Sequence, residues 1–105
     1  MPPVIEYSTQ AQLDLDEILE YYLLTVDEDT AIKAITAILT EIDYLTNTPM
    51  LGRDIASEAP QYRVWPVFRS RYKIYFERVA TDHIKVIRVY GSKRKPLGTE
   101  EITKM

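Results

Sequence analysis

Helical spacing of apolar residues is the clearest pattern in the chain, and it occurs twice. Apolar residues recur every three or four positions in residues 11–22 and again in residues 31–45, as they do along one side of an amphipathic helix. The acidic segment "VDEDT", residues 26–30, separates the two stretches. Two helices joined by so short a turn run antiparallel and pair through their apolar stripes. The stripes are Ala11, Leu15, Ile18 and Tyr22, and then Ala31, Ile35, Ile38, Ile42 and Leu45.

Alternating patterns predict strands on both sides of this helical hairpin. Residues 4–8 form a short first strand, and Ser8 or Thr9 can cap the helix that follows. Beyond a loop at residues 49–60, three further alternating segments are joined by short connections, which predicts an antiparallel meander. The order β-α-α-β-β-β indicates an α+β fold with a helical hairpin packed on a small antiparallel sheet. These later strands are expected at residues 62–65, 72–76 and 84–90.

Length and composition limit what this fold can contain. The 105 residues suffice for a single domain, residues 1–105, and we expect residues 96–105 to be a flexible tail. The sequence has no cysteine and no metal-ligand or glycine-rich phosphate motif, so we expect no disulfide, metal or cofactor. No apolar run approaches the roughly 20 residues that span a bilayer, and the start lacks the features of a secretory signal. We therefore expect a soluble cytoplasmic protein.

Charge is distributed unevenly along the chain. The formal net charge is -3, but residues 1–60 hold twelve acidic and two basic side chains, whereas residues 61–105 hold eleven basic and four acidic ones. If Ile74 and Phe76, with Ile87 and Val89, face the helices, the opposite sheet face is basic and aromatic. That face would present Arg63, Lys73, Tyr75, Arg88 and Tyr90, with Lys93, Arg94 and Lys95 at its rim. The alternative is that these cations only keep the edges of the sheet soluble.

Several segments together resemble one known family, the ParE/RelE superfamily of bacterial toxins from toxin–antitoxin modules. The resemblance covers roughly residues 4–95 and depends on the order and spacing of the segments. It fits the ParE branch better than the RelE branch. The chain departs from the family in having Gly91 where many relatives have a histidine, and its tail lacks the tyrosine of the RelE-like nuclease pattern. The segments are "AQLDLDEILEYY", "NTPMLGR", "YRVWPV", "SRYKIYFERV" and "IKVIRVYGSKR".

The resemblance implies a toxin that is neutralised by a cognate antitoxin, whose C-terminal segment wraps around it. ParE-like members poison DNA gyrase, whereas RelE-like members cut mRNA on the ribosome. The family's arginines match Arg53, Arg63, Arg88 and Arg94 in this sequence. We therefore expect a hetero-oligomer with an antitoxin and DNA gyrase as the target, and leave a dimer of the free toxin open.

Two other functions remain possible on the sequence alone. The chain could be a ribosome-dependent mRNA endoribonuclease, with the ribosome and mRNA as partners, or an inactive member that only binds its antitoxin. A nuclease needs groups that transfer protons, and the lone His83 is expected in a turn away from the basic residues. The candidate residues for toxicity are Arg63, Arg88, Tyr90, Lys93, Arg94 and Lys95. Leu19, Leu23 and Leu24 lie off the main stripe of the first helix and are the candidates for antitoxin binding.

Overall fold

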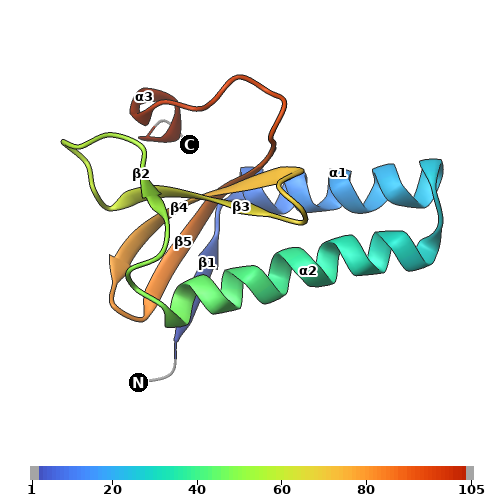
Figure 1. The fold of residues 1–105 in the computed structure, drawn as a ribbon, viewed down its shortest axis with the longest axis horizontal. Helices are drawn as coiled ribbons and strands as arrows, with labels where there is room; N and C mark the ends of the chain where they lie inside the picture. The colour runs from blue at the N-terminus through green and yellow to red at the C-terminus, as the bar shows by residue number, and fades with distance from the viewer. Residues whose placement is uncertain (1–2, 104–105) are drawn as a thin grey trace.

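A computed structural model describes residues 3–103 and places two layers of structure against each other (Figure 1). The sheet has five strands in the order β1-β5-β4-β3-β2. A long helical hairpin packs on one face of this sheet, and a short helix lies on the other side. The elements are β1 (Val4–Tyr7), α1 (Thr9–Thr25), α2 (Glu28–Asn47), β2 (Arg53–Asp54), β3 (Tyr62–Val67), β4 (Tyr72–Ala80), β5 (His83–Gly91) and α3 (Thr99–Thr103).

The predicted α+β fold and helical hairpin are confirmed, while the sheet differs in one respect. β1 pairs with β5 in parallel, so the sheet is mixed and not purely antiparallel. β5, β4, β3 and β2 pair antiparallel, as the short connections predicted for the three long strands. The sequence also gave no sign of β2, which has only two residues, or of α3.

Side chains cap the N-terminal ends of both long helices. Ser8 precedes α1, and its Oγ accepts a hydrogen bond from the backbone N–H of Ala11 at 3.0 Å. The same hydroxyl donates to the carbonyl of Ile87 at 2.6 Å, so it also ties the start of α1 to β5. Asp27 caps α2 by accepting from the N–H of Thr30 at 2.7 Å. Such caps satisfy backbone donors that a helix leaves free at its start.

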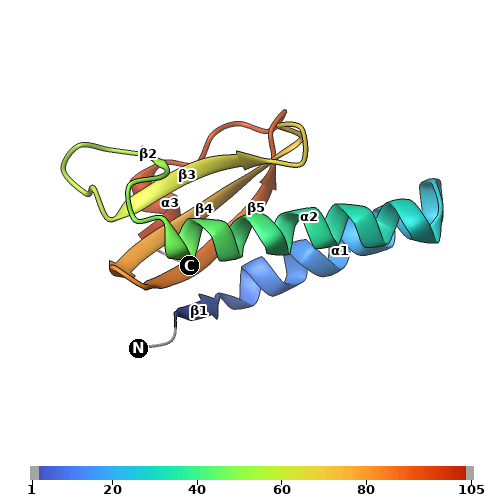
Figure 2. The same ribbon diagram turned by 60° about the horizontal axis from the view of Figure 1, so that its bottom comes forward.

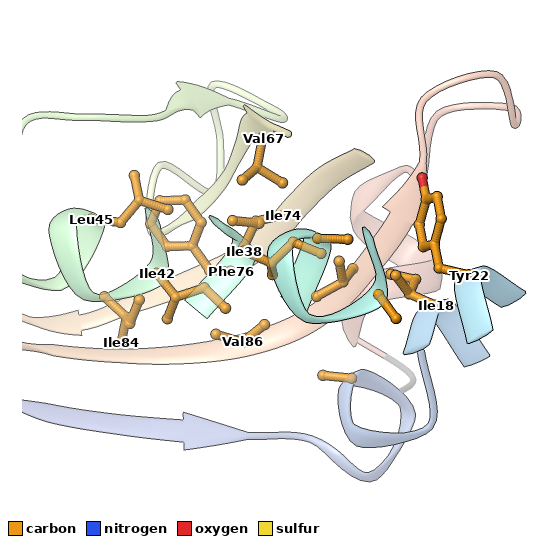
Figure 3. Packing of buried hydrophobic residues seen from close by; sticks show 14 residues of the cluster. Ile18, Tyr22, Ile38, Ile42, Leu45, Val67, Ile74, Phe76, Ile84 and Val86 are labelled. Carbon is orange, nitrogen blue, oxygen red and sulfur yellow. The ribbon is translucent and has the colours of Figure 1, made fainter. Parts of the chain in front are cut away.

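The main core lies between the hairpin and the sheet (Figure 3). Ile38, Ile42 and Leu45 of α2 are fully buried there. They pack with buried residues of β4 and β5, among them Phe76 and Val86. Burying an aliphatic or aromatic side chain of this size contributes about 1.5–3 kcal/mol each, so this contact fixes the position of the hairpin on the sheet.

A β-bulge in β5 changes which side chains face the helices. Tyr75 pairs with Arg88, but the next residue, Phe76, pairs with Val86, so Ile87 is the extra residue. The sequence analysis placed Ile87 with Val89 on the helix side. In the structure Val89 is in the main core, whereas Ile87 belongs to a second cluster on the opposite face.

The second cluster explains why the chain end is not a free tail. Ile102 of α3 is only 2% exposed and packs with Val64, Tyr75 and Ile87 on the sheet face opposite the hairpin. The N–H of Leu97 donates to the phenol oxygen of Tyr75 at 3.3 Å. The expectation of a flexible tail at residues 96–105 is therefore corrected for residues 97–103, because Leu97 and Ile102 pack against the apolar side chains of this sheet face. Residues 104 and 105 lie outside the described part.

Gly52 gives a test of the close packing around the loop before β3. Its φ is +100°, and a Cβ there would lie 2.8 Å from Cζ of Phe76 and 3.1 Å from Cβ of Arg63. We expect Gly52→Ala to lower the free energy of unfolding by about 2 kcal/mol, through backbone strain and overpacking. Gly98→Ala is the control, because a Cβ there meets only Glu101 at 3.7 Å. Urea unfolding of both variants measures the difference, and equal stabilities would contradict the prediction.

Candidate functional site

Arg63 lies on the helix side of the sheet and holds the loop that precedes β3. It pairs with Phe76 across the β3–β4 ladder, which puts it on the face of the main core. Its guanidinium donates to the carbonyls of Pro60, Pro49 and Leu51, each at 3.2 Å. The predicted position of Arg63 on the basic face is therefore wrong. The error arose because β3 turns Val64, and not Arg63, toward the second cluster.

The loop and the end of α2 depend on arginines in ways that the sequence did not indicate. Arg53, which matches one of the family's arginines, is exposed in β2. Arg78 of β4 instead donates to the carbonyls of Leu45 at 2.6 Å and Thr46 at 3.2 Å, at the C-terminal end of α2. A cation there binds unpaired carbonyls and favours the helix dipole. Burial lowers the pKa of Arg78, yet an arginine stays charged at neutral pH.

Arg88 is bound to Asp14 of α1 in a two-point salt bridge. Nε of Arg88 is 2.7 Å from Oδ2 of Asp14, and Nη2 is 2.8 Å from Oδ1. Oδ2 also accepts the backbone N–H of Val89 at 3.0 Å, so Asp14 covers the edge of β5 beyond the end of β1. Both side chains are largely buried, with 15% of Arg88 and 7% of Asp14 exposed. The hydrogen bond to Asp14 raises the pKa of Arg88.

Asp14 was missed as a structural residue. The sequence analysis counted it only among the twelve acidic side chains of residues 1–60. The available signal was its position, because Asp14 lies three residues after Ala11 and four before Ile18, inside the buried stripe of α1. A carboxylate on such a stripe needs a buried partner.

Two guanidinium groups contact the ring of Tyr90. The Cζ atoms of Arg88 and Arg94 are 4.9 Å and 5.0 Å from the centre of its ring. The ring also meets Tyr75 edge-on, with centroids 6.2 Å apart. Cations over an aromatic face are attracted by its quadrupole. Tyr90 therefore links the buried salt bridge to the exposed end of the chain's basic segment.

Five cations gather at one end of the sheet. Lys93, Arg94 and Lys95, called the basic tip here, are all exposed. The N–H of Ser92 donates to the carbonyl of Arg71 at 2.9 Å, which places the turn between β3 and β4 beside the tip. The turn adds Arg69 and Arg71, which are also exposed and which the sequence analysis missed. We call these five residues the cationic rim: Arg69, Arg71, Lys93, Arg94 and Lys95.

A groove lined by tyrosines opens beside this rim. One cavity of about 610 Å³ lies between α1 and the rim and is lined by Tyr21, Tyr22 and Tyr72. A smaller cavity of about 290 Å³ shares Tyr21 and Tyr72 with it and adds Tyr90 and Glu17. Burial raises the pKa of Tyr72, whose hydroxyl donates to the phenol oxygen of Tyr22 at 3.5 Å. We call the two cavities together the tyrosine groove.

Comparison with known proteins agrees with the fold described above. A family model described as "ParE toxin of type II toxin-antitoxin system, parDE" matches residues 5–96. The chain belongs to this family. A solved structure titled "Chromosomal ParDE TA system from P. aeruginosa" has the same fold, with a TM-score of 0.70 and 23% sequence identity, and the match covers 87% of this chain and 97% of that one. No curated protein matches.

The helical hairpin of this ParE-family chain carries an apolar surface at its free end. Figures 1 and 2 show the turn between α1 and α2 extending well past the sheet. Of the three leucines predicted to bind the antitoxin, Leu23 is 47% and Leu24 77% exposed, whereas Leu19 packs against the core. The sequence analysis missed the neighbouring exposed apolar residues Val26 and Ile32.

The lone histidine of this ParE-family chain lies away from the cationic rim. His83 is the first residue of β5, next to Glu6, at the end of the strand opposite the basic tip. Within residues 3–103 no cluster of histidine, aspartate or glutamate could hold a metal ion. In the same residues no helix is long and apolar enough to cross a membrane.

Proposed function

We propose that this ParE-family toxin is neutralised by a cognate antitoxin and arrests growth by binding DNA gyrase, without catalysing a reaction. The observation that carries this proposal is the engagement of the two strand arginines. Arg63 holds the loop before β3 and Arg88 is paired with Asp14, so neither is free to act on a phosphate. Five exposed cations gather in the rim, which suits a surface that binds a target.

The alternative of an mRNA endoribonuclease has less support. RNA cleavage needs one group to take a proton from the 2'-hydroxyl and another to protonate the leaving oxygen. His83 is far along β5 from the rim, and Glu17 is the one carboxylate in the tyrosine groove that is not paired, since Asp14 binds Arg88. The tyrosines remain as proton donors, but burial raises the pKa of Tyr72 and so makes it a weaker acid.

Growth and gyrase assays test this proposal together. Induced expression of the chain alone should stop growth, and co-expression of the neighbouring antitoxin gene should restore it. Purified toxin should block gyrase supercoiling or trap gyrase-cleaved DNA, while mRNA in a purified translation reaction stays intact. Site-specific mRNA cuts would overturn the proposal in favour of the nuclease. Normal growth with soluble toxin present would favour an inactive member.

For the antitoxin we propose contact with the free end of the hairpin. Leu23 and Leu24 of α1, Val26 of the turn and Ile32 of α2 are exposed there. Exposed apolar groups gathered in this way favour an amphipathic helix of a partner, which buries them. An acidic partner segment could also reach the rim, because opposite charges favour that contact.

Leu23→Glu tests this surface. A charge there should weaken antitoxin binding by about tenfold or more, because it must lose water in the interface. The fold should be spared, since Leu23 is about half exposed. Leu13→Glu is the matched control, with the same residue type, 48% exposure and a position near the other end of α1. Titration calorimetry measures both, and a loss of thermal stability for Leu23→Glu would instead place that residue in the core.

A further inference from the structure

We propose that the tyrosine groove and its cationic rim bind single-stranded DNA. The inference rests on the proposed function. It assigns the DNA of a gyrase–DNA complex as the ligand of the groove and rim. Phosphates would lie on the rim, and bases would stack on the exposed ring of Tyr21 and the partly exposed ring of Tyr72. The two classes of contact come from different elements that meet at one end of the sheet.

The charges of the rim are not neutralised within the chain. Among residues 3–103 the ion pairs are Arg63 with Asp54, His83 with Glu6 and Arg88 with Asp14, so none involves a rim cation. Five exposed cations on a chain of net charge -3 are a local concentration of positive charge. Lys and Arg side chains of this kind bind the phosphates of nucleic acids and release counterions.

The floor of the groove is aromatic. Tyr21 is 56% exposed and meets Tyr22 edge-on, with ring centroids 5.0 Å apart. Tyr72 stacks with Phe68, which in turn packs against Tyr22. A positively charged groove with aromatic rings is the arrangement by which proteins hold single strands, since every base has a face that can stack. In a duplex the bases are already stacked inside and cannot reach these rings.

The turn that carries Arg69 has an unusual backbone conformation. Phe68, Arg69 and Ser70 have φ values of 52°, 56° and 63°, in the left-handed region that these residues rarely adopt. The ring of Phe68 fixes the turn against Tyr22 and Tyr72. Strained backbone that is held by its surroundings gathers at functional sites. Here it keeps Arg69 and Arg71 next to the basic tip before a ligand arrives.

Binding is measured with the full chain, freed of antitoxin, and a fluorescein-labelled 12-nucleotide DNA strand. Fluorescence anisotropy at 50 and 150 mM salt should give affinity that falls with salt, and weaker binding for the same sequence as a duplex. An RNA strand of the same sequence should bind no tighter than the DNA. The inference is overturned if no binding is seen at 50 mM salt, if the duplex binds equally well, or if RNA binds tenfold tighter.

Variants separate the phosphate and base contacts. Lys93→Ala should weaken binding and lower the slope of log affinity against log salt by about 0.7, as for one lost phosphate contact with a single strand. Tyr21→Ala should weaken binding about tenfold without changing that slope, since stacking does not release ions. Tyr21→Phe keeps the ring and should bind normally. Lys33→Ala is the control for loss of charge, because it removes an exposed charge from α2, outside the groove lining. If Tyr21→Ala bound the DNA strand as tightly as wild type does, the binding would reflect charge attraction alone. The proposed role of the groove would then be wrong.

The outcomes are distinct from those that test the proposed function. If gyrase is poisoned equally by wild type and by Tyr21→Ala, and no oligonucleotide binds, the inference fails while the proposed function holds. If the DNA strand binds as described and gyrase keeps its full activity, the proposed target is wrong and the groove remains a DNA-binding site. Circular dichroism of each variant confirms that its fold is intact.

Discussion

Asp14→Ala should lower the free energy of unfolding by about 3 kcal/mol or more, the largest stability effect that we expect of a single change. The substitution leaves the guanidinium of Arg88 largely buried without its partner and removes the acceptor of the Val89 N–H. Native domains of this size have only about 5–15 kcal/mol of stability. Urea unfolding followed by circular dichroism measures the shift.

A control variant and a double variant test this prediction further. Asp16→Ala removes an exposed acid two residues away and should stay within about 0.5 kcal/mol of wild type. The double change Asp14→Leu with Arg88→Met should recover most of the loss, because an apolar pair can replace a buried ion pair. If Asp14→Ala were as mild as Asp16→Ala, the salt bridge would contribute little to the fold.

Changes in the basic tip should have the largest effect on toxicity. Arg94→Ala, and more so the triple change of Lys93, Arg94 and Lys95 to alanine, should weaken binding to the target by about hundredfold. Arg94 matters most, because a guanidinium can hold a carboxylate or phosphate at two points whereas an ammonium cannot. All three side chains are exposed, so thermal stability should change little. Survival after induced expression measures the loss of toxicity that this weaker binding should cause.

Arg53→Ala serves as the control for these variants. It removes an exposed arginine from β2 and should remain fully toxic. A fully toxic triple variant with normal expression would show that the tip is ordinary solvated charge. The target-binding surface would then have to be sought among the remaining rim residues Arg69 and Arg71 or on the helical hairpin.

The sequence predicted the helices better than the faces of the sheet. Helical spacing in α1 and α2 extends over several turns, and Ile18, Ile38 and Ile42 are buried as expected. The sheet depends on register, and one extra residue in β5 reverses the side on which the following residues lie. Alternation alone could not locate the bulge at Ile87 or place Arg63, whose partners are carbonyls of a loop.

The candidate site could be found in part. The basic tip was visible because its three cations are adjacent in sequence, and they are exposed in the structure. Arg69 and Arg71 were not associated with it, because only the pairing of β4 with β5 brings their turn to the same end of the sheet. The tyrosine groove likewise combines residues of α1 and β4 that are about fifty positions apart, such as Tyr22 and Tyr72.

The parallel pairing of β1 with β5 has a consequence for how the toxin is made. Ser8 at the end of β1 bonds to the carbonyl of a residue 79 positions later, and contacts between such distant residues form slowly. Synthesis proceeds from the N-terminus, so the helical hairpin leaves the ribosome before any strand that covers it except β1. Ile38 and Ile42 must wait for β4 and β5 to bury them. We therefore expect the nascent chain to expose the core side of its hairpin until translation is almost complete, when an antitoxin already present could meet it.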